Sequence, residues 1–244
     1  MEHIYGRHSV LSVLENPQRQ VKIITIQKNL PNNSVINKII DLAKIKNVKV
    51  EFVPLVKLER KYSMGKRRHQ GVVAVASELK TYTFKQLTKH LGNNPLLAIL
   101  DHVNDPHNLG AIIRSAELAG FDAVIIPERR NASLTNTVVK TSSGATEKIP
   151  IVKVANINES IRQLKKLGVW VYGIETGGEN IYNANFNLPV DLVLGTEGEG
   201  LSRLTAKLCD KILTIPMYGK TASLNVSVAA GIAMFTAAKD RHKI

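Results

Sequence analysis

The sequence predicts an α/β protein in two parts, a small α/β domain followed by a larger domain built on a parallel sheet. Three observations support this prediction. Residues 95–244 alternate continuous apolar runs with helical stretches, which is typical of a parallel sheet covered on both faces. Residues 1–77 alternate shorter helices and strands. Between these parts, residues 78–94 are polar and mixed in character, so we expect a linker there.

The first part is expected to form a small α/β sandwich. Apolar residues recur at helical spacing after Ser9, which can cap a helix, and other stretches alternate apolar and polar residues as strands do. The expected helices cover residues 5–14, 33–45 and 55–62, and the expected strands cover residues 21–26, 48–53 and 72–76. Such a unit lies near the lower size limit of an independent domain.

The second part is expected to contain buried strands with helices between them. Runs such as residues 96–100 lack polar positions, as strands covered on both faces do. The strands are expected at residues 96–100, 123–126, 169–174, 192–195 and 211–216, and the helices at residues 109–119, 135–142, 157–167, 201–207 and 224–241. Ligands bind where the carboxyl ends of such strands meet, so the segments after the strands are the expected site.

Positive charge is concentrated in the first part of the chain. The formal net charge is +13, and residues 1–90 contain 17 of the 33 Lys and Arg residues but 6 of the 20 Asp and Glu residues. A basic part beside a nearly neutral one indicates a polyanion-binding domain attached to a catalytic domain, with nucleic acid as the expected polyanion. Arg7 and the loop residues Lys66, Arg67 and Arg68 are the candidate phosphate contacts.

Composition disfavours several classes of protein. No apolar run reaches the roughly 20 residues that a membrane span needs, and the first residues lack the order of a signal peptide. The single cysteine, Cys209, allows neither an intrachain disulfide nor a cysteine metal cage, and we interpret it as a packed thiol. We expect a cytoplasmic protein without a metal and without a membrane or DNA partner.

Residues 108–114 are the first of three segments that carry chemistry. They follow the strand at residues 96–100, and Gly110, near the expected helix start, lets a ligand or another backbone approach closely. Arg114 falls in the second turn of the expected helix, where its guanidinium can hold a phosphate with two parallel hydrogen bonds. Taken alone, the segment is equally typical of an ordinary helix start.

Residues 194–201 and 215–225 are the other two segments. The first of them is a glycine-rich loop, and its carboxylates Glu197 and Glu199 suit a cationic or hydroxyl-bearing ligand better than a phosphate. It matches neither a dinucleotide fingerprint nor a phosphate-binding loop, which disfavours a nucleotide-dependent oxidoreductase. In the last segment, Ser223 is expected to cap the final helix.

In this order, the three segments resemble the three motifs of the SpoU (TrmH-like) branch of the SPOUT RNA methyltransferases. The resemblance covers residues 95–244, and residues 1–77 resemble the ribosomal-protein-like RNA-binding domain that opens many members. The chain is similar to the bacterial 23S rRNA (guanosine-2′-O-)-methyltransferases. The resemblance implies a parallel-sheet SPOUT fold with a C-terminal trefoil knot, an exception to the rule against knots, and a homodimer.

The resemblance also implies a cofactor and residue roles. The cofactor is S-adenosyl-L-methionine, and no metal takes part. The cofactor-contacting positions are Gly195, Ile215 and Leu224, with Thr176 as a weaker candidate. The catalytic positions are Arg114, Glu197, Ser223 and Asn225, and Asn108 joins the candidate RNA contacts.

The implied reaction is attack of a ribose 2′-hydroxyl on the sulfonium methyl, with loss of the hydroxyl proton. An arginine side chain ordinarily has a pKa above about 12, so it is a poor proton acceptor. Our hypothesis is that Arg114 instead holds the adjoining phosphate and stabilises the developing alkoxide. In this hypothesis Ser223 and Asn225 position Arg114 or the ribose, and Glu197 fixes the loop or Arg114.

The expected activity is therefore methylation of a ribose 2′-hydroxyl in large-subunit rRNA, most simply that of a guanosine. Three alternatives stay open. The same chemistry could act on tRNA, or on an rRNA adenosine as in the antibiotic-resistance members. A protein of another class could bind RNA without catalysis during ribosome assembly.

Overall fold

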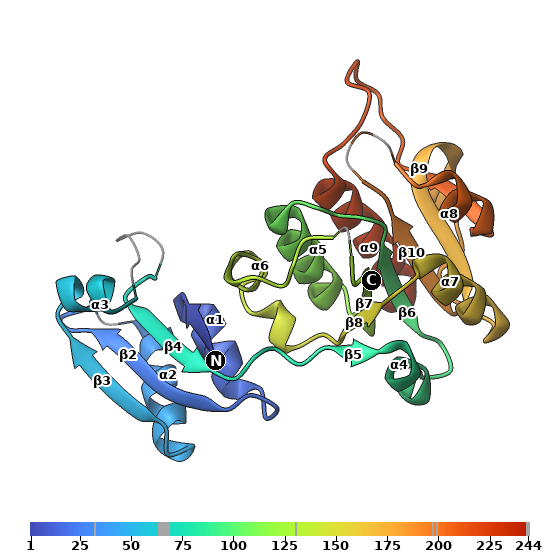
Figure 1. Ribbon diagram of the computed structural model, residues 1–244. Helices are drawn as coiled ribbons and strands as arrows, with labels where there is room; N and C mark the ends of the chain where they lie inside the picture. The colour runs from blue at the N-terminus through green and yellow to red at the C-terminus, as the bar shows by residue number, and fades with distance from the viewer. Residues whose placement is uncertain (32, 63–68, 130, 197, 199, 243–244) are drawn as a thin grey trace. The chain divides into compact units, whose positions relative to one another are not determined.

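The computed structural model divides into two compact units (Figure 1). It describes residues 1–244 except 32, 63–68, 130, 197, 199 and 243–244. The first unit consists of Met1–Lys80 and Leu134–Lys148, and the second unit consists of Thr81–Ser133 and Ile149–Ile244. The chain therefore passes between the units three times, which the sequence pattern did not predict.

The first unit is built on a four-stranded sheet. Its strands are β1 (Glu2–Tyr5), β2 (Val21–Gln27), β3 (Lys49–Val53) and β4 (Val72–Ala76), and its helices are α1 (Arg7–Glu15), α2 (Ser34–Ile45), α3 (Leu55–Tyr62), α6 (Asn136–Thr141) and the 3₁₀ helix η1 (Ala145–Glu147). The strand order is β1-β4-β2-β3, with β4 antiparallel to both neighbours and β2 parallel to β3. Apolar side chains of α1 and α2 pack with those of the sheet in one core.

Strand β1 is a correction to the sequence prediction, which placed a helix from residue 5 with Ser9 as its cap. Helix α1 begins at Arg7, after Gly6 with a φ of 98°, and four strand residues are too few to show an alternation. Ser9 is buried, and its Oγ donates to the backbone oxygen of Val139 at 3.4 Å. It therefore packs against α6 and does not cap α1.

Residues 134–148 are fixed in the first unit by a buried ion pair. The Arg19 and Glu147 side chains have no exposed surface, and Arg19 Nε lies 3.5 Å from Glu147 Oε2. Asn16 Nδ2 donates to the same oxygen at 2.8 Å, and Arg19 Nη2 reaches Glu2 Oε2 at 3.0 Å. Burial raises the pKa of Glu147, which Arg19 and Asn16 partly offset.

The second unit is built on a seven-stranded sheet in which neighbouring strands run parallel. Its strands are β5 (Tyr82–Thr83), β6 (Leu96–Leu100), β7 (Ala123–Pro127), β8 (Ile151–Val154), β9 (Trp170–Asn180), β10 (Val190–Leu194) and β11 (Lys211–Thr214), in the order β11-β9-β10-β6-β7-β8-β5. Its helices are α4 (Phe84–His90), α5 (Pro106–Leu118), α7 (Ile157–Lys166), α8 (Arg203–Leu208) and α9 (Val226–His242), with the 3₁₀ helix η2 (Ile181–Asn183). The predicted α/β class with a parallel sheet is confirmed, whereas the trefoil knot stays a prediction.

Helices cover both faces of this sheet, as the continuous apolar runs predicted. Side chains of α4, α7 and α8 pack in one core with Leu97, Ile99 and Val193. Helices α5 and α9 pack against each other on the other face (Figure 1). Every residue of β6 and β10 is buried, so these two central strands form the rigid base of the sheet.

The structure contains elements that the sequence pattern did not predict. Strand β5 and helix α4 lie within residues 78–94, where a linker was expected, and Thr83 caps α4 through a capping box with Gln86. Strand β8 is short and interrupted by the exposed Lys153, so it shows no continuous apolar run. Among the described residues, no helix is long and apolar enough to cross a membrane.

Candidate active site

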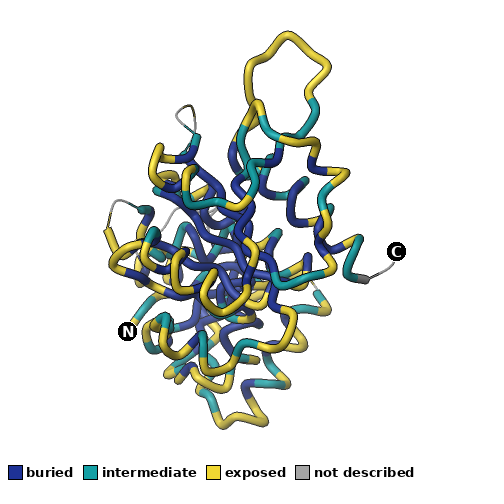
Figure 2. The backbone as a smooth tube through the Cα atoms, turned by 90° about the vertical axis from the view of Figure 1, so that its right-hand side faces the viewer, coloured by how far each residue is buried: buried dark blue, intermediate teal, exposed yellow. Residues whose placement is uncertain are grey.

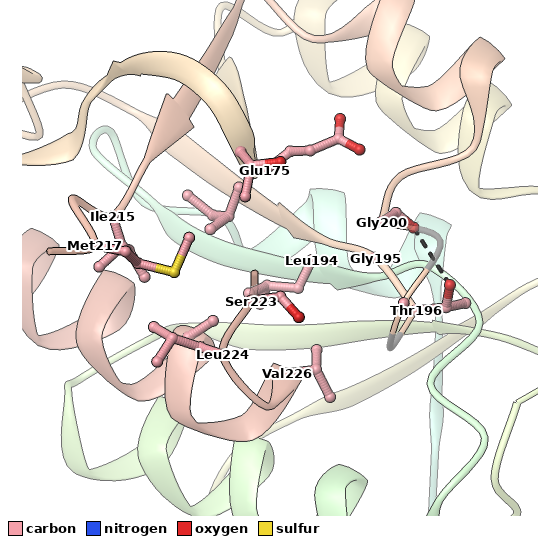
Figure 3. A pocket seen from close by; sticks show the side chains of 14 residues that line it. Glu175, Leu194, Gly195, Thr196, Gly200, Ile215, Met217, Ser223, Leu224 and Val226 are labelled. Atoms are coloured by element: carbon pink, nitrogen blue, oxygen red, sulfur yellow. Dashed lines mark hydrogen bonds between the residues drawn. The ribbon is translucent and has the colours of Figure 1, made fainter. Parts of the chain in front are cut away.

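The second and third segments meet at one pocket at the carboxyl edge of the second unit's sheet (Figure 3). The pocket is lined by residues that follow β10 and β11, by residues of β9, and by the start of α9. Gly195, Ile215, Leu224 and Thr176, the predicted cofactor positions, all line it, and so does Ser223. These residues come from four separate parts of the chain, and the parallel strand order brings them together.

In the glycine loop after β10 (residues 195–200), Thr196 and Gly200 are hydrogen-bonded to each other. Thr196 N donates to Gly200 O at 3.0 Å, and Gly200 N donates to Thr196 O at 3.3 Å. A Cβ at Gly195 would lie 2.1 Å from Gly200 O, so no larger residue fits there without a shift of the backbone. Gly200 has a φ of +67°, which favours glycine. Of the described loop residues, Gly195, Gly198 and Gly200 therefore offer only backbone to the pocket, which Thr196 also lines.

The first segment forms the start of α5. Asp105 caps the helix by accepting a hydrogen bond from His107 N at 2.9 Å, so the helix begins earlier than predicted. Gly110 is therefore inside the helix, and Arg114 lies in its third turn and not in its second. The Arg114 side chain is exposed, so its guanidinium is accessible to a ligand.

Asn108 and Asn225 join the first segment to the third. Asn225 Nδ2 donates to Asn108 Oδ1 at 3.2 Å, and Asn108 is buried. Asn225 Oδ1 also accepts hydrogen bonds from Ser227 N at 2.9 Å and Ser227 Oγ at 2.6 Å. Asn225 thus caps α9, the role that the sequence suggested for Ser223, because the helix begins only at Val226.

The loop that contains Ser223 is open to solvent. Residues 217–225, between β11 and α9, are all exposed, and Figure 2 shows this stretch as a continuous exposed loop. Ser223 and Leu224 therefore form a wall of the pocket that is not covered by another part of the described chain.

Asp101 is a site residue that the sequence analysis missed. It directly follows β6 and is buried, and its Oδ2 accepts a hydrogen bond from Ser202 N at 3.3 Å. Its backbone N donates to Leu194 O at 2.7 Å, and its Oδ1 pairs with Nδ1 of His102. Asp101 thereby anchors both ends of the glycine loop. Its position at a strand end was the signal that could have revealed it.

The remaining predicted residues lie elsewhere or outside the described residues. Arg7 is in the first unit, where its Nε donates to Gln70 O at 3.2 Å and its backbone N donates to Gln70 Oε1 at 3.0 Å. Arg7 is therefore held beside Gln70. Glu197, Lys66, Arg67 and Arg68 fall among the residues that the structure does not describe.

The described residues contain no group of three His, Cys, Asp or Glu side chains arranged to hold a metal ion. Burial raises the pKa of the Cys209 thiol to about 12, so it stays protonated near neutral pH. Its Sγ lies 3.3 Å from Thr205 O, and the side chain packs beside the core of the second unit. Cys209 is thus a packed thiol and not a nucleophile.

Comparisons with known proteins match both parts of the chain. Residues 95–235 match the model of the SpoU rRNA Methylase family, and residues 3–82 match the model named RNA 2′-O ribose methyltransferase substrate binding. A 23S rRNA (guanosine-2′-O-)-methyltransferase of Xylella fastidiosa is 40% identical over 242 residues, which cover 98% of this chain and 96% of that protein. A putative TrmH family tRNA/rRNA methyltransferase of Bacillus subtilis is 34% identical over 250 residues, covering 100% of this chain and 97% of that protein.

A solved structure shares the fold. The SpoU methyltransferase AviRb from Streptomyces viridochromogenes, in complex with AdoMet, has a TM-score of 0.81 at 22% identity, covering 99% of this chain and 91% of that one. The predicted resemblance is confirmed, and with it the class of RNA 2′-O-ribose methyltransferase. The chain belongs to the SpoU rRNA methylase family.

Proposed function

We propose that this protein transfers a methyl group from S-adenosyl-L-methionine to the ribose 2′-hydroxyl of a guanosine in large-subunit (23S) rRNA. The observation that carries the proposal is the pocket in which the second and third segments meet, joined to the first segment through Asn108 and Asn225. The name of the Xylella fastidiosa relative supports the choice of rRNA and guanosine.

The pocket fits an adenosine-containing cofactor. Gly195, Gly198 and Gly200 line it and have no side chain, so a ligand can lie directly against their backbone. Ile215, Met217 and Leu224 provide apolar surface for a flat heterocycle. When bound, S-adenosyl-L-methionine would supply a methyl group on a sulfonium, and Gly195, Ile215, Leu224 and Thr176 are the proposed contacts.

We assign the chemistry of the acceptor to the start of α5. The Arg114 guanidinium would hold the phosphate next to the target ribose and stabilise the alkoxide that develops as the hydroxyl loses its proton. Asn225, Ser223 and Glu197 would position Arg114 or the ribose. Because Asn108 is buried and bonded to Asn225, we infer that it positions Asn225 and makes little direct contact with RNA.

The first unit would bind the RNA. Arg7 and the basic loop residues Lys66, Arg67 and Arg68 are the proposed phosphate contacts. We further propose a cytoplasmic homodimer, with the knot of the SPOUT fold near the C-terminus, a substrate-binding domain at 1–77 and a catalytic domain at 95–244. Residues 78–94 join them and include β5 and α4. The exposed apolar side chains Val228 and Phe235 on α9 agree with a subunit interface there.

The test is methyl transfer from labelled S-adenosyl-L-methionine to large-subunit rRNA. Free rRNA, subunits from cells that lack the gene, and tRNA are compared, and the modified nucleotide is mapped. We expect one 2′-O-methylguanosine in the rRNA, which disappears with Arg114→Ala.

Each other outcome would overturn part of the proposal. Labelling of tRNA alone, or of an rRNA adenosine, would retain the chemistry and change the substrate. RNA binding without transfer to any RNA would favour the non-catalytic assembly factor.

A further inference from the structure

Glu175 places a carboxylate in the pocket, in a position that none of the three sequence segments includes. It lies in β9 between Ile174 and Thr176, and all three residues line the pocket. Its backbone oxygen accepts a hydrogen bond from Thr214 Oγ1 at 2.5 Å, so the main chain at this point is fixed to β11. The side chain is half-buried. Among the described residues that line the pocket, Glu175 is therefore the one with a charged side chain.

The Glu175 carboxylate reaches across to the glycine loop. A Cβ placed on Gly200 would lie 2.3 Å from Glu175 Oε1 and 3.2 Å from its Cδ. The carboxylate thus occupies the space that the missing side chain of Gly200 leaves. Of the hydrogen bonds between described residues, none ends at this carboxylate, so its oxygens have acceptor capacity for a ligand.

The pocket has two chemically different sides. Ile215, Met217 and Leu224 gather on one side, and the Glu175 carboxylate points away from them toward Gly200 (Figure 3). An adenosine has a matching division, because its base is flat and apolar on its faces while its ribose carries two adjacent hydroxyl donors. A carboxylate can accept both hydroxyls, one on each oxygen.

The position of Glu175 also separates it from the acceptor side of the site. Figure 3 shows Glu175 across the pocket from Ser223 and Val226, which lead into α9. Helix α9 packs on α5, which carries Arg114, so the reactive sulfonium must face that side. The 2′- and 3′-hydroxyls of an adenosine point away from its 5′-carbon, to which the sulfur is attached. The hydroxyl edge therefore faces the side where Glu175 lies.

We propose that the Glu175 carboxylate binds the 2′- and 3′-hydroxyls of the cofactor ribose, and so selects an adenosine with an intact ribose. This inference rests on the proposed function only in taking S-adenosyl-L-methionine as the cofactor. The competing arrangement, in which the carboxylate pairs with the ammonium group of the methionine portion, is distinguished by the choice of ligands below.

The test is calorimetric binding to the full chain, without RNA or turnover. The ligands are S-adenosylhomocysteine, 5′-methylthioadenosine, which lacks the amino-acid portion, and the 2′,3′-dideoxy form of 5′-methylthioadenosine. Glu175→Gln keeps the size of the side chain and removes its charge. Because hydrogen bonds to charged groups are the stronger class, we expect the variant to bind the first two ligands about tenfold more weakly, by the same factor.

The dideoxy ligand separates a direct contact from general damage to the pocket. Wild type should bind it about tenfold more weakly than 5′-methylthioadenosine, whereas Glu175→Gln should bind the two alike. The matched control is Glu179→Gln, on the same strand but outside the pocket, where Glu179 is exposed and pairs with Lys211 at 2.8 Å. The control should bind all three ligands as wild type does.

The other outcomes are unambiguous. Weaker binding of S-adenosylhomocysteine alone would assign Glu175 to the ammonium group and overturn the ribose assignment. Unchanged affinities, or an equal loss for the dideoxy ligand, would overturn any contact with the hydroxyls. Failure of wild type to bind S-adenosylhomocysteine would instead contradict the cofactor in the proposed function.

Discussion

Two ionisable side chains of the second unit have opposite surroundings, one exposed and one buried. Arg114 is exposed on α5, where its guanidinium is available to a phosphate or a developing oxyanion. Asp191 is on the central strand β10 with no exposed surface, and neither carboxylate oxygen has a hydrogen-bond partner among the described residues. The Arg114 guanidinium is available for function, whereas the buried Asp191 carboxyl is expected to make the stability of the fold depend on pH.

Arg114→Lys tests the proposed role of the guanidinium. Lysine keeps the charge but not the planar fork, so we expect the rate constant of methyl transfer to fall about 100-fold while affinity for S-adenosylhomocysteine stays unchanged. Single-turnover methylation of the rRNA substrate measures the first quantity. Arg162→Lys is the control, because Arg162 is on α7 at the opposite face of the sheet. Activity of Arg114→Lys near that of wild type would rule out the role.

Asp191→Asn tests the consequence of the buried carboxyl. Burial raises its pKa from the ordinary value of 3.8 to about 8. Between these values the folded protein keeps a proton that the unfolded chain releases, so stability falls as pH rises, by at most about 1.4 kcal/mol per pH unit. Asparagine does not titrate. The free energy of unfolding of Asp191→Asn should therefore fall less steeply with pH than that of wild type, by up to about 1.4 kcal/mol per pH unit.

The measurement is urea unfolding at pH 5, 6 and 7, followed by the fluorescence of Trp170. This is the single tryptophan of the chain, and it lies in β9 of the same unit. Parallel pH profiles for wild type and Asp191→Asn would show that Asp191 does not titrate in this range.

Among the elements, the loops after β6, β10 and β11 depend on one another. Asp101 holds the start and the end of the glycine loop through Leu194 O and Ser202 N. Asn225 caps α9 and also bonds to Asn108 on α5. Helix α9 is fixed near its other end by Arg241, which donates to Phe186 O at 2.7 Å and to Pro95 O at 3.2 Å. The site is therefore formed by elements that rigid strands and long-range hydrogen bonds hold together.

Gly195→Ala tests the close approach within the glycine loop. The added Cβ would lie 2.1 Å from Gly200 O, so the loop must move. Such overpacking typically costs about 1–3 kcal/mol, and we expect the affinity for S-adenosylhomocysteine to fall at least about tenfold. Gly219→Ala is the matched control, because no atom lies within 4 Å of its added Cβ. Equal binding by both variants would show that the loop tolerates the shift.

At the scale of the whole molecule, the two units have different expected partners. The first unit carries the excess of positive charge, and the second carries the pocket. The Arg19–Glu147 pair fixes residues 134–148 in the first unit, so the unit is not formed by the first 80 residues alone. Binding of RNA and binding of cofactor should therefore be separable by mutation.

Arg7→Gln tests this separation. Loss of one phosphate contact should weaken RNA binding a few-fold and reduce the slope of log affinity against log salt by about 1, with no change in cofactor affinity. Filter binding at several salt concentrations measures both effects. Lys44→Gln removes a charge from an exposed position of the same unit, in the last turn of α2, and serves as the control. An equal change in slope for both variants would indicate a general charge effect instead.

Local pattern in the sequence determined the class of fold. Continuous apolar runs marked β6, β7 and residues 192–194 of β10 as buried parallel strands, because a strand covered on both faces needs no polar positions. Glycines after the strands marked the segments that line the pocket. The same local reasoning failed for β1, β5 and β8, since short strands show too few positions for a period to be visible.

Only the tertiary structure decided which of these residues meet. Hydrogen bonds join Asn225 to Asn108 and Asp101 to Ser202, which are far apart in the chain. The Glu175 carboxylate likewise lies beside Gly200, on a different element. The inclusion of residues 134–148 in the first unit is likewise a long-range result. Sequence periodicity reports which side of an element is buried. Contact between elements depends on strand order and register, which pairing across the whole sheet sets.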